Sequence, residues 1–251
     1  MEAGALGATR EGWWSRFVSQ NFFLIRKLHS LAGLLFAFFL FFHIFQNGAI
    51  LAGAESYDIS VAQLNRLPIP LIRTLELLLI FGPLIFHALV GIFILGEARY
   101  NLYRYRYAEN WQYTLQRLTG IFLLFGIGFH LVQMWWPKFL TTSTFTRQLV
   151  GLLWAGVEKY NVPEITAQFV ATQMAPHTNS WGMATPIIYI LLVIAAAFHA
   201  GNGIWEFFCR WGLAVSPPGQ RLVKQICWLI TLVLAVLGIW TVWVFSFGGI
   251  V

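Results

Sequence analysis

Five long apolar stretches dominate the pattern of hydrophobic and polar positions along the chain. They cover Leu31–Ala52, Leu71–Leu95, Leu118–Trp136, Met183–Phe208 and Cys227–Phe247. Each is close to the ~20 residues that a helix needs to cross the hydrocarbon core of a membrane. Each is also continuously apolar, whereas the strands of a membrane barrel alternate over about ten residues. The pattern therefore predicts an all-α membrane protein in which residues 1–251 form one domain, a bundle of five transmembrane helices.

The polar segments outside these stretches add two expectations. Residues 1–20 carry scattered charges but no apolar core followed by a small-residue cleavage site, so we expect a retained N-terminal extension rather than a signal peptide. Residues 137–180 form a long connection between the third and fourth stretches. Within this connection, apolar side chains recur at helical spacing from Phe145 to Tyr160, which predicts an amphipathic helix on the membrane surface.

Composition agrees with a membrane protein. Hydrophobic residues make up 58% of the 251 residues and charged residues 10%, which is too apolar for an ordinary soluble domain. We expect the surface to meet lipid and expect no nucleic-acid partner. Two isolated cysteines, Cys209 and Cys227, flank the last connection, and they suggest neither a disulfide framework nor a thiolate metal site.

The basic residues predict the orientation of the bundle. With the N-terminus inside, eleven arginines and lysines fall on the cytoplasmic side and five on the other side. Because cytoplasmic loops carry an excess of positive charge, this count favours a cytoplasmic N-terminus and an external C-terminus.

Four histidines occupy the first four stretches, one on each: His43, His87, His130 and His199. A histidine inside a bilayer is costly and usually functional. The rise of a helix places His43 and His130, the outer pair, roughly 20–24 Å from the cytoplasmic edge, and His87 and His199, the inner pair, about 10–15 Å from it. A lone intramembrane histidine is more often a hydrogen-bonded polar residue, but two depth-matched pairs are what two bis-histidine haems need. We therefore predict that the four are axial haem ligands.

The surroundings of the histidines agree with this prediction. A haem wedged between helices needs small residues beside its ligands, although small residues also serve close helix packing. The candidates are Gly91, Gly126, Gly128, Ala195, Ala196, Ala197, Gly201 and Gly203. Haem propionates need donors at an aqueous edge, and the run from Arg26 to Ser30 together with Arg210 supplies them.

Four sequence strings carry a resemblance to a known family. They are Arg26-Lys27-Leu28-His29-Ser30-Leu31-Ala32-Gly33, Phe86-His87-Ala88-Leu89-Val90-Gly91, Leu115-Gln116-Arg117-Leu118-Thr119-Gly120 and Phe198-His199-Ala200-Gly201-Asn202-Gly203, followed by Trp211-Gly212 and Ser216-Pro217. The chain resembles the single-subunit, dihaem cytochrome b membrane anchor of succinate dehydrogenases and fumarate reductases, the succinate:quinone oxidoreductases. The resemblance extends from Asn21 to about residue 225 and includes the number of helices and the order of the histidines. The N-terminal extension and the length of the outer connection depart from the family pattern.

The resemblance implies a role for each site residue. His43 and His130 would hold the distal b haem, His87 and His199 the proximal one, while His29, Ser30 and Arg210 would lie near the proximal propionates. The family also implies two cytoplasmic partner subunits, a flavoprotein with FAD and an iron–sulfur protein, in a complex of the bacterial cytoplasmic membrane whose higher oligomeric state stays open. This chain itself has no glycine-rich dinucleotide motif and no cysteine cluster, so it would not oxidise succinate alone.

Electrons would then reach a quinone, which the dihaem class implies to be menaquinone. Polar residues near the outer edge are candidates for its site: Gln46, Asn47, Arg73, Glu76 and Gln133. An acid and donors beside the outer haem could hold and protonate a quinone headgroup. For Arg73 and Glu76 a purely structural ion pair, one helical turn apart, is equally open.

Two other readings stay open on chemistry alone. One is the cytochrome b anchor of a hydrogenase or formate dehydrogenase, and the other is a transporter that carries histidines but no haem. A cytochrome b of the bc type would place two haem histidines on each of two helices, whereas each stretch here carries one.

Overall fold

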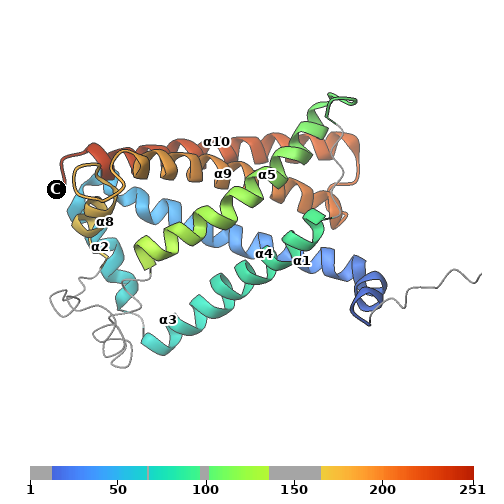
Figure 1. Ribbon diagram of the computed structural model, residues 1–251, viewed down its shortest axis with the longest axis horizontal. Helices are drawn as coiled ribbons and strands as arrows, with labels where there is room; N and C mark the ends of the chain where they lie inside the picture. Colours follow the sequence, from blue (N-terminus) through green and yellow to red (C-terminus); the bar gives the residue numbers. More distant parts are fainter. Residues whose placement is uncertain (1–12, 67, 97–101, 136–164) are drawn as a thin grey trace, which may run out of the picture.

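The computed structural model describes residues 13–66, 68–96, 102–135 and 165–251, and these form helices joined by turns, with no strand among them (Figure 1). The elements in chain order are α1 (Trp13–Asn47), the 3₁₀ segment η1 (Gly48–Ala52), α2 (Ala54–Asn65), α3 (Ile69–Leu75), the π-helical segment η2 (Glu76–Phe81), α4 (Gly82–Gly96), α5 (Ala108–His130), the π-helical segment η3 (Leu131–Trp135), α8 (Ala167–Met174), α9 (Ala184–Arg210) and α10 (Pro217–Phe247).

The described residues contain five helices long and apolar enough to cross a membrane. They run over Gln20–Ala52, Pro70–Gly96, Ala108–Met134, Ala184–Arg210 and Pro217–Phe247. The predicted all-α bundle of five transmembrane helices is therefore confirmed. The predicted surface helix from Phe145 to Tyr160 lies outside the described residues, and the cytoplasmic N-terminus stays a prediction.

Three of the predicted helix starts were placed too late. α1 begins at Trp13 and is continuous through the expected start at Leu31. α5 begins at Ala108 rather than Leu118, and α10 begins at Pro217 rather than Cys227. Ser216 caps α10, because its Oγ accepts a hydrogen bond from the backbone N–H of Gly219, and proline suits the first helical turn. An apolar stretch marks only the part of a helix that lies in hydrocarbon. The polar turns of the same helix beyond the membrane therefore cannot be recognised from it.

The two cysteines flank the last connection as expected: Cys209 lies near the end of α9 and Cys227 within α10. Both are free thiols, and the Cys227 side chain is buried. The connection itself is shorter than expected because both helices continue past their apolar stretches.

Helix α9 is the centre of the bundle, since it packs against α10, α5 and α1, while α4 packs mainly against α1. Small residues allow the closest approach, between α9 and α10: a Cβ atom added at Gly201 would overlap Thr231, and one at Gly238 would lie 2.7 Å from Cγ1 of Val193. Gly201 thus serves helix packing, the second of its two expected roles. Large apolar side chains such as Phe125 and Leu229 stay exposed on the outside, as a lipid-facing surface requires.

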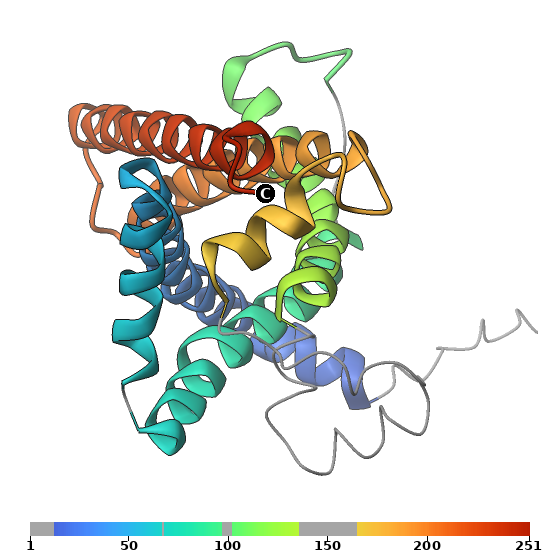
Figure 2. The same ribbon diagram turned by 90° about the vertical axis from the view of Figure 1, so that its left-hand side faces the viewer.

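Two short helices that the sequence did not predict close one end of the bundle. α2 and α8 pack against each other there, and the Asp58 carboxylate accepts a hydrogen bond of 2.6 Å from the backbone N–H of Ala167. Figure 2 shows α8 lying across this end, in front of the long helices. We call it the outer end, and we call the opposite end, where Trp211 and the start of α10 lie, the basic end.

Candidate metal centres

The structure brings the four intramembrane histidines together in two pairs. The ring centroids of His43 (α1) and His130 (α5) are 5.7 Å apart with an interplanar angle of 76°. Those of His87 (α4) and His199 (α9) are 6.0 Å apart at 84°. These are the same two pairs that helical depth suggested. Metal–imidazole bonds are about 2 Å long, as for zinc, so a metal between two ligating nitrogens is compatible with this spacing.

The inner pair has both Nδ1 atoms occupied. His87 Nδ1 lies 3.0 Å from the backbone oxygen of His29, an acceptor, so Nδ1 carries the proton. His199 Nδ1 lies 3.2 Å from the Thr119 hydroxyl oxygen. The single proton of that hydroxyl is donated to the backbone oxygen of Leu115 at 2.7 Å, so Thr119 accepts from His199. In both rings Nε2 therefore keeps its lone pair for a metal.

In the outer pair, His130 is held by a chain of side chains. Its Nδ1 lies 3.3 Å from the Tyr189 hydroxyl oxygen, which donates its own proton to Gln133 Oε1 at 3.0 Å. Gln133 Nε2 donates in turn to the backbone oxygen of Gln173 in α8 at 2.9 Å. Gln133 lies in the π-helical segment that begins directly after His130, and such segments often occur at functional sites. His130 Nε2 is thus also free to bind a metal.

His43 differs from the other three. Asn47 Nδ2 donates to the His43 backbone oxygen at 2.7 Å and lies 3.3 Å from His43 Nδ1. An amide N–H facing Nδ1 favours the tautomer with its proton on Nε2. For His43 to bind a metal through Nε2, the Asn47 side chain must turn so that its oxygen accepts from Nδ1.

Of the predicted propionate residues, His29 and Ser30 lie beside the inner pair. The His29 ring stacks on His87 with centroids 4.0 Å apart, and its buried Nδ1 has no hydrogen-bond partner. The Ser30 hydroxyl donates to the backbone oxygen of Lys27 at 2.9 Å and accepts from the Trp211 indole at 3.0 Å. His29 is therefore free to donate to an added group, whereas the single proton of Ser30 is already used.

The third predicted propionate residue, Arg210, belongs to a basic cluster. Its guanidinium lies 3.8 Å from the Glu206 carboxylate, which also interacts electrostatically with Arg117 and Arg26. The Nε atoms of Arg26 and Arg117 are buried without a partner. Leaving a buried charged donor unpaired is costly. Three guanidinium groups against one carboxylate, together with the unpaired His29 nitrogen, suit an anionic group such as the carboxylates of a haem.

A polar chain that sequence reasoning missed connects the basic cluster to the inner pair. Gln116 Nε2 donates to the backbone oxygen of His199 at 3.1 Å, and its Oε1 accepts from Asn202 at 3.1 Å. The Asn202 amide also donates to Glu206 at 3.1 Å. Buried amides within apolar helices were the available signal, but the sequence does not say which groups they face.

Two glycines make room for the inner imidazoles. A Cβ atom added at Gly33 would lie 2.6 Å from Cε1 of His87, and one at Gly120 would lie 3.2 Å from Cε1 of His199. The absence of a side chain at both positions is what allows the rings to stand against the neighbouring helices. The sequence predicted that small residues would make room for the ligands, but the glycines it pointed to were different ones.

The predicted quinone residues are spread over several elements. Gln46 is half-buried in α1, Asn47 contacts His43 of the outer pair, and Gln133 accepts a hydrogen bond from Tyr189. Glu76 is half-buried at the start of η2, a segment that packs against α1. Arg73 lies in α3, and its side chain is outside the described part of the structure. The structure thus gives Asn47 and Gln133 a contact with the outer histidines or with Tyr189.

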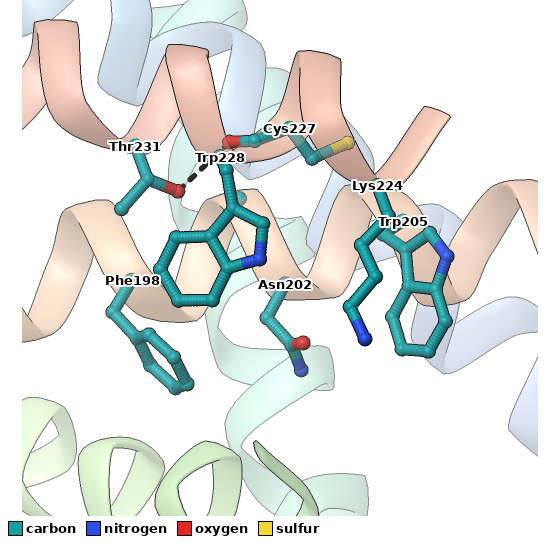
Figure 3. Close-up of a pocket in the computed structure, with 8 residues that line it drawn as sticks. Phe198, Asn202, Trp205, Lys224, Cys227, Trp228 and Thr231 are labelled. Atoms are coloured by element: carbon teal, nitrogen blue, oxygen red, sulfur yellow. Dashed lines mark hydrogen bonds between the residues drawn. The ribbon is translucent and has the colours of Figure 1, made fainter. Parts of the chain in front are cut away.

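A narrow groove lies between α9 and α10 at the basic end (Figure 3). It is walled by Trp205 and Trp228, with the Asn202 amide and the Lys224 side chain beside them. Lys224 is paired with Glu109 at 3.2 Å. The enclosed space is about 10 Å³, enough for one water molecule and far too small for a quinone ring.

Among the residues that the structure describes, no three histidine, cysteine or carboxylate side chains converge on one metal position. Haem iron takes four ligands from its porphyrin, so two histidines on opposite sides are a sufficient protein contribution. Their role as haem ligands stays a prediction.

Comparison with known proteins gives one clear relative. The chain is 30% identical over 231 residues to the succinate dehydrogenase cytochrome b558 subunit of Bacillus subtilis (strain 168), and the match covers 89% of this chain and 96% of the relative. No protein-family model matches the chain.

Proposed function

Because the chain belongs to the family of succinate dehydrogenase cytochrome b subunits, we propose that it holds two b haems, one on each histidine pair. Family membership makes it a multi-pass bacterial membrane protein and a subunit of an enzyme complex, and a cytochrome b contains haem b. The observation that carries the proposal is the pairing of His43 with His130 and of His87 with His199. The hydrogenase, formate dehydrogenase and transporter readings have no comparable support.

When bound, the two haems would supply a one-electron route across the membrane from the partner iron–sulfur subunit to a quinone, menaquinone in our proposal. The chain's own residues would bind the haems and orient the histidine ligands. At the inner pair, the His29 backbone oxygen and the Thr119 hydroxyl hold the two imidazoles by Nδ1, which leaves each Nε2 free to bind a haem iron. At the outer pair, Tyr189 does the same for His130.

We assign the inner propionates to the basic cluster. Arg26, Arg117 and His29 offer buried nitrogen donors that lack partners, and Arg210 adds positive charge beside them. A charge-assisted bond from a guanidinium to a carboxylate is stronger than a neutral hydrogen bond. Ser30 would support the site through Trp211 rather than through a free proton. The flavoprotein and iron–sulfur subunits would dock at this basic end, on the cytoplasmic side.

We place the quinone site beside the outer pair, with Glu76 as the proton-exchanging group and Arg73 and Gln46 as further candidates. Asn47 and Gln133 already bond to His43 and Tyr189, so we assign them to holding the outer pair. The Glu76 segment packs against α1, the helix that carries His43. A half-buried acid on a membrane-spanning helix is unusual, which supports a functional role.

Haem quantitation on the purified whole complex tests the proposal. We expect two b haems per copy of this chain, both reduced by succinate. One haem, or none, would contradict it. An alternative place for a quinone is the groove near Trp205 (Figure 3), but its small enclosed volume disfavours that position.

The quinone site needs its own variant. Glu76→Gln should leave both haems assembled and reducible by succinate, yet slow electron delivery to quinone. Glu55→Gln, an exposed acid on α2, is the matched control and should behave as the unaltered complex. Unchanged quinone reduction in Glu76→Gln, with both haems present, would move the quinone site elsewhere.

A further inference from the structure

Tyr189 connects His130 of the outer pair to other residues at the outer end of the bundle. It comes from the second turn of α9, it is 4% exposed, and its hydroxyl lies 3.3 Å from His130 Nδ1. Its ring also packs edge-on against His130 with centroids 5.8 Å apart, and Phe129 covers it from another side. The hydroxyl is therefore held in place by packing as well as by hydrogen bonds.

The hydrogen bonds of Tyr189 have a fixed direction. A phenol has one proton, and Tyr189 donates it to Gln133 Oε1 at 3.0 Å. Gln133 is itself oriented, because its Nε2 donates to the Gln173 backbone oxygen at 2.9 Å, which requires Oε1 to face the tyrosine. Tyr189 is left as an acceptor toward His130, so the imidazole donates through Nδ1.

We propose that Tyr189 is a positioning residue that fixes the orientation of His130 and, through it, lowers the reduction potential of the outer haem. The proposal rests on the proposed function, because it needs a haem on His130. An acceptor at Nδ1 makes the imidazole a better electron donor through Nε2. Stronger donation stabilises the oxidised iron, and hydrogen bonds in this position are a known means by which proteins set haem potentials. The donation of the tyrosine to Gln133 polarises its oxygen and strengthens the effect.

The relay also connects the outer haem ligand to a helix beyond the membrane span. Gln173 belongs to α8, and α8 is fastened at its first residue by the bond from Ala167 to Asp58. The inner pair has no such connection: His87 is held by a backbone oxygen and His199 by a hydroxyl on the neighbouring span. Tyr189 therefore acts on one haem only.

Potentiometric titration of both haems in the purified complex tests the proposal, with Tyr189→Phe as the variant and Thr119→Val as its counterpart. Tyr189→Phe should raise the midpoint potential of the outer haem and leave the inner one unchanged. Thr119→Val should raise the inner potential and leave the outer one unchanged. If both haems are present in Tyr189→Phe and the outer potential does not move, or only the inner one moves, the proposal is wrong.

A second variant covers the case in which Tyr189→Phe fails to retain the outer haem. Gln133→Leu keeps the phenol but removes the group that accepts its proton, so the outer potential should rise by less than in Tyr189→Phe. No shift in Gln133→Leu, with both haems bound, would overturn the proposal. Failure of the proposed function is distinct, because the unaltered complex would then lack one or both haems before any substitution.

Discussion

The inner and outer histidine pairs have similar ring spacing but are held by different means. The inner pair is fixed by a backbone oxygen and a hydroxyl close in the bundle, His29 and Thr119. The outer pair depends on side-chain amides and a phenol, Asn47, Tyr189 and Gln133. Backbone acceptors change little with sequence, whereas a side-chain relay can be altered at each member. The outer pair is thus the more adjustable of the two.

The charges around the two pairs differ as well. Beside the inner pair lie Arg26, Arg117 and Arg210, with buried nitrogens that lack partners on the first two. The side chains bonded to the outer pair are neutral. A positive environment favours the reduced, less positive form of a haem. The inner site therefore suits a charged group, whereas the outer site is built from neutral hydrogen bonds, and we expect a haem at the inner site to have the higher potential.

The largest effect is expected from a substitution that disrupts the inner pair alone. In Gly33→Val, the new side chain would start 2.6 Å from the His87 ring, closer than atoms can approach, so His87 must move. Overpacking of this kind costs about 1–3 kcal/mol and here also displaces a ligand. We expect loss of the inner haem with retention of the outer haem, measured as haem content per chain.

Gly96→Val is the control for that substitution, because a Cβ atom there meets nothing within 4 Å. It should keep both haems. Retention of both haems in Gly33→Val, or loss of the outer haem alone, would show that the ring of His87 is not placed as described.

A smaller effect is expected from a substitution that tests the difference in charge between the inner and outer pairs. Arg117→Gln removes a guanidinium whose Nε is buried without a partner, so the inner haem should lose stabilisation of its reduced form. We expect its midpoint potential to fall by roughly 20–60 mV, equivalent to about 0.5–1.4 kcal/mol for one electron, while the outer potential moves much less. Lys224→Gln is the control, since Lys224 is already paired with Glu109. Equal shifts of both haems in Arg117→Gln would remove the electrostatic distinction between the pairs.

The smallest effect concerns the support that α8 gives the outer pair. Asp58→Ala removes the acceptor for the first backbone N–H of α8, a loss comparable to that of a helix cap, about 0.5–2 kcal/mol. Amide hydrogen exchange in Ala167–Met174 should accelerate, and the electron paramagnetic resonance signal of the outer haem should broaden slightly while that of the inner haem stays unchanged. Asp58→Asn keeps an acceptor oxygen and should behave as the unaltered chain. Unchanged exchange in Asp58→Ala would mean that α8 is held by packing alone.

The sequence predicted the features that depend on position along a helix. Apolar length identified the five spans, and the rise per residue was enough to sort the histidines by depth. What it missed depends on rotation about the helix axes. Thr119 and Tyr189 became recognisable only once α5 and α9 were seen to pack against each other. Depth does not say which of two residues on neighbouring turns faces the next helix.

The glycines illustrate the same limit. Gly201 lies next to a ligand-bearing turn in sequence, yet it faces α10, whereas Gly33 is on another helix and lies against His87. The starts of α1, α5 and α10 and the short helices α2 and α8 escaped prediction for a different reason, because they lie outside the apolar stretches that mark the membrane.

The most direct test of the account is potentiometric titration of the complex in four variants, His43→Ala, His130→Ala, His87→Ala and His199→Ala. The two rings of each pair are close neighbours, with centroids 5.7 and 6.0 Å apart, so both members should hold the same haem. We predict that His43→Ala and His130→Ala each lose one and the same haem, that His87→Ala and His199→Ala each lose the other, and that the remaining haem keeps a midpoint potential close to its original value. Loss of the same haem in His43→Ala and His87→Ala would contradict the pairing on which the account depends.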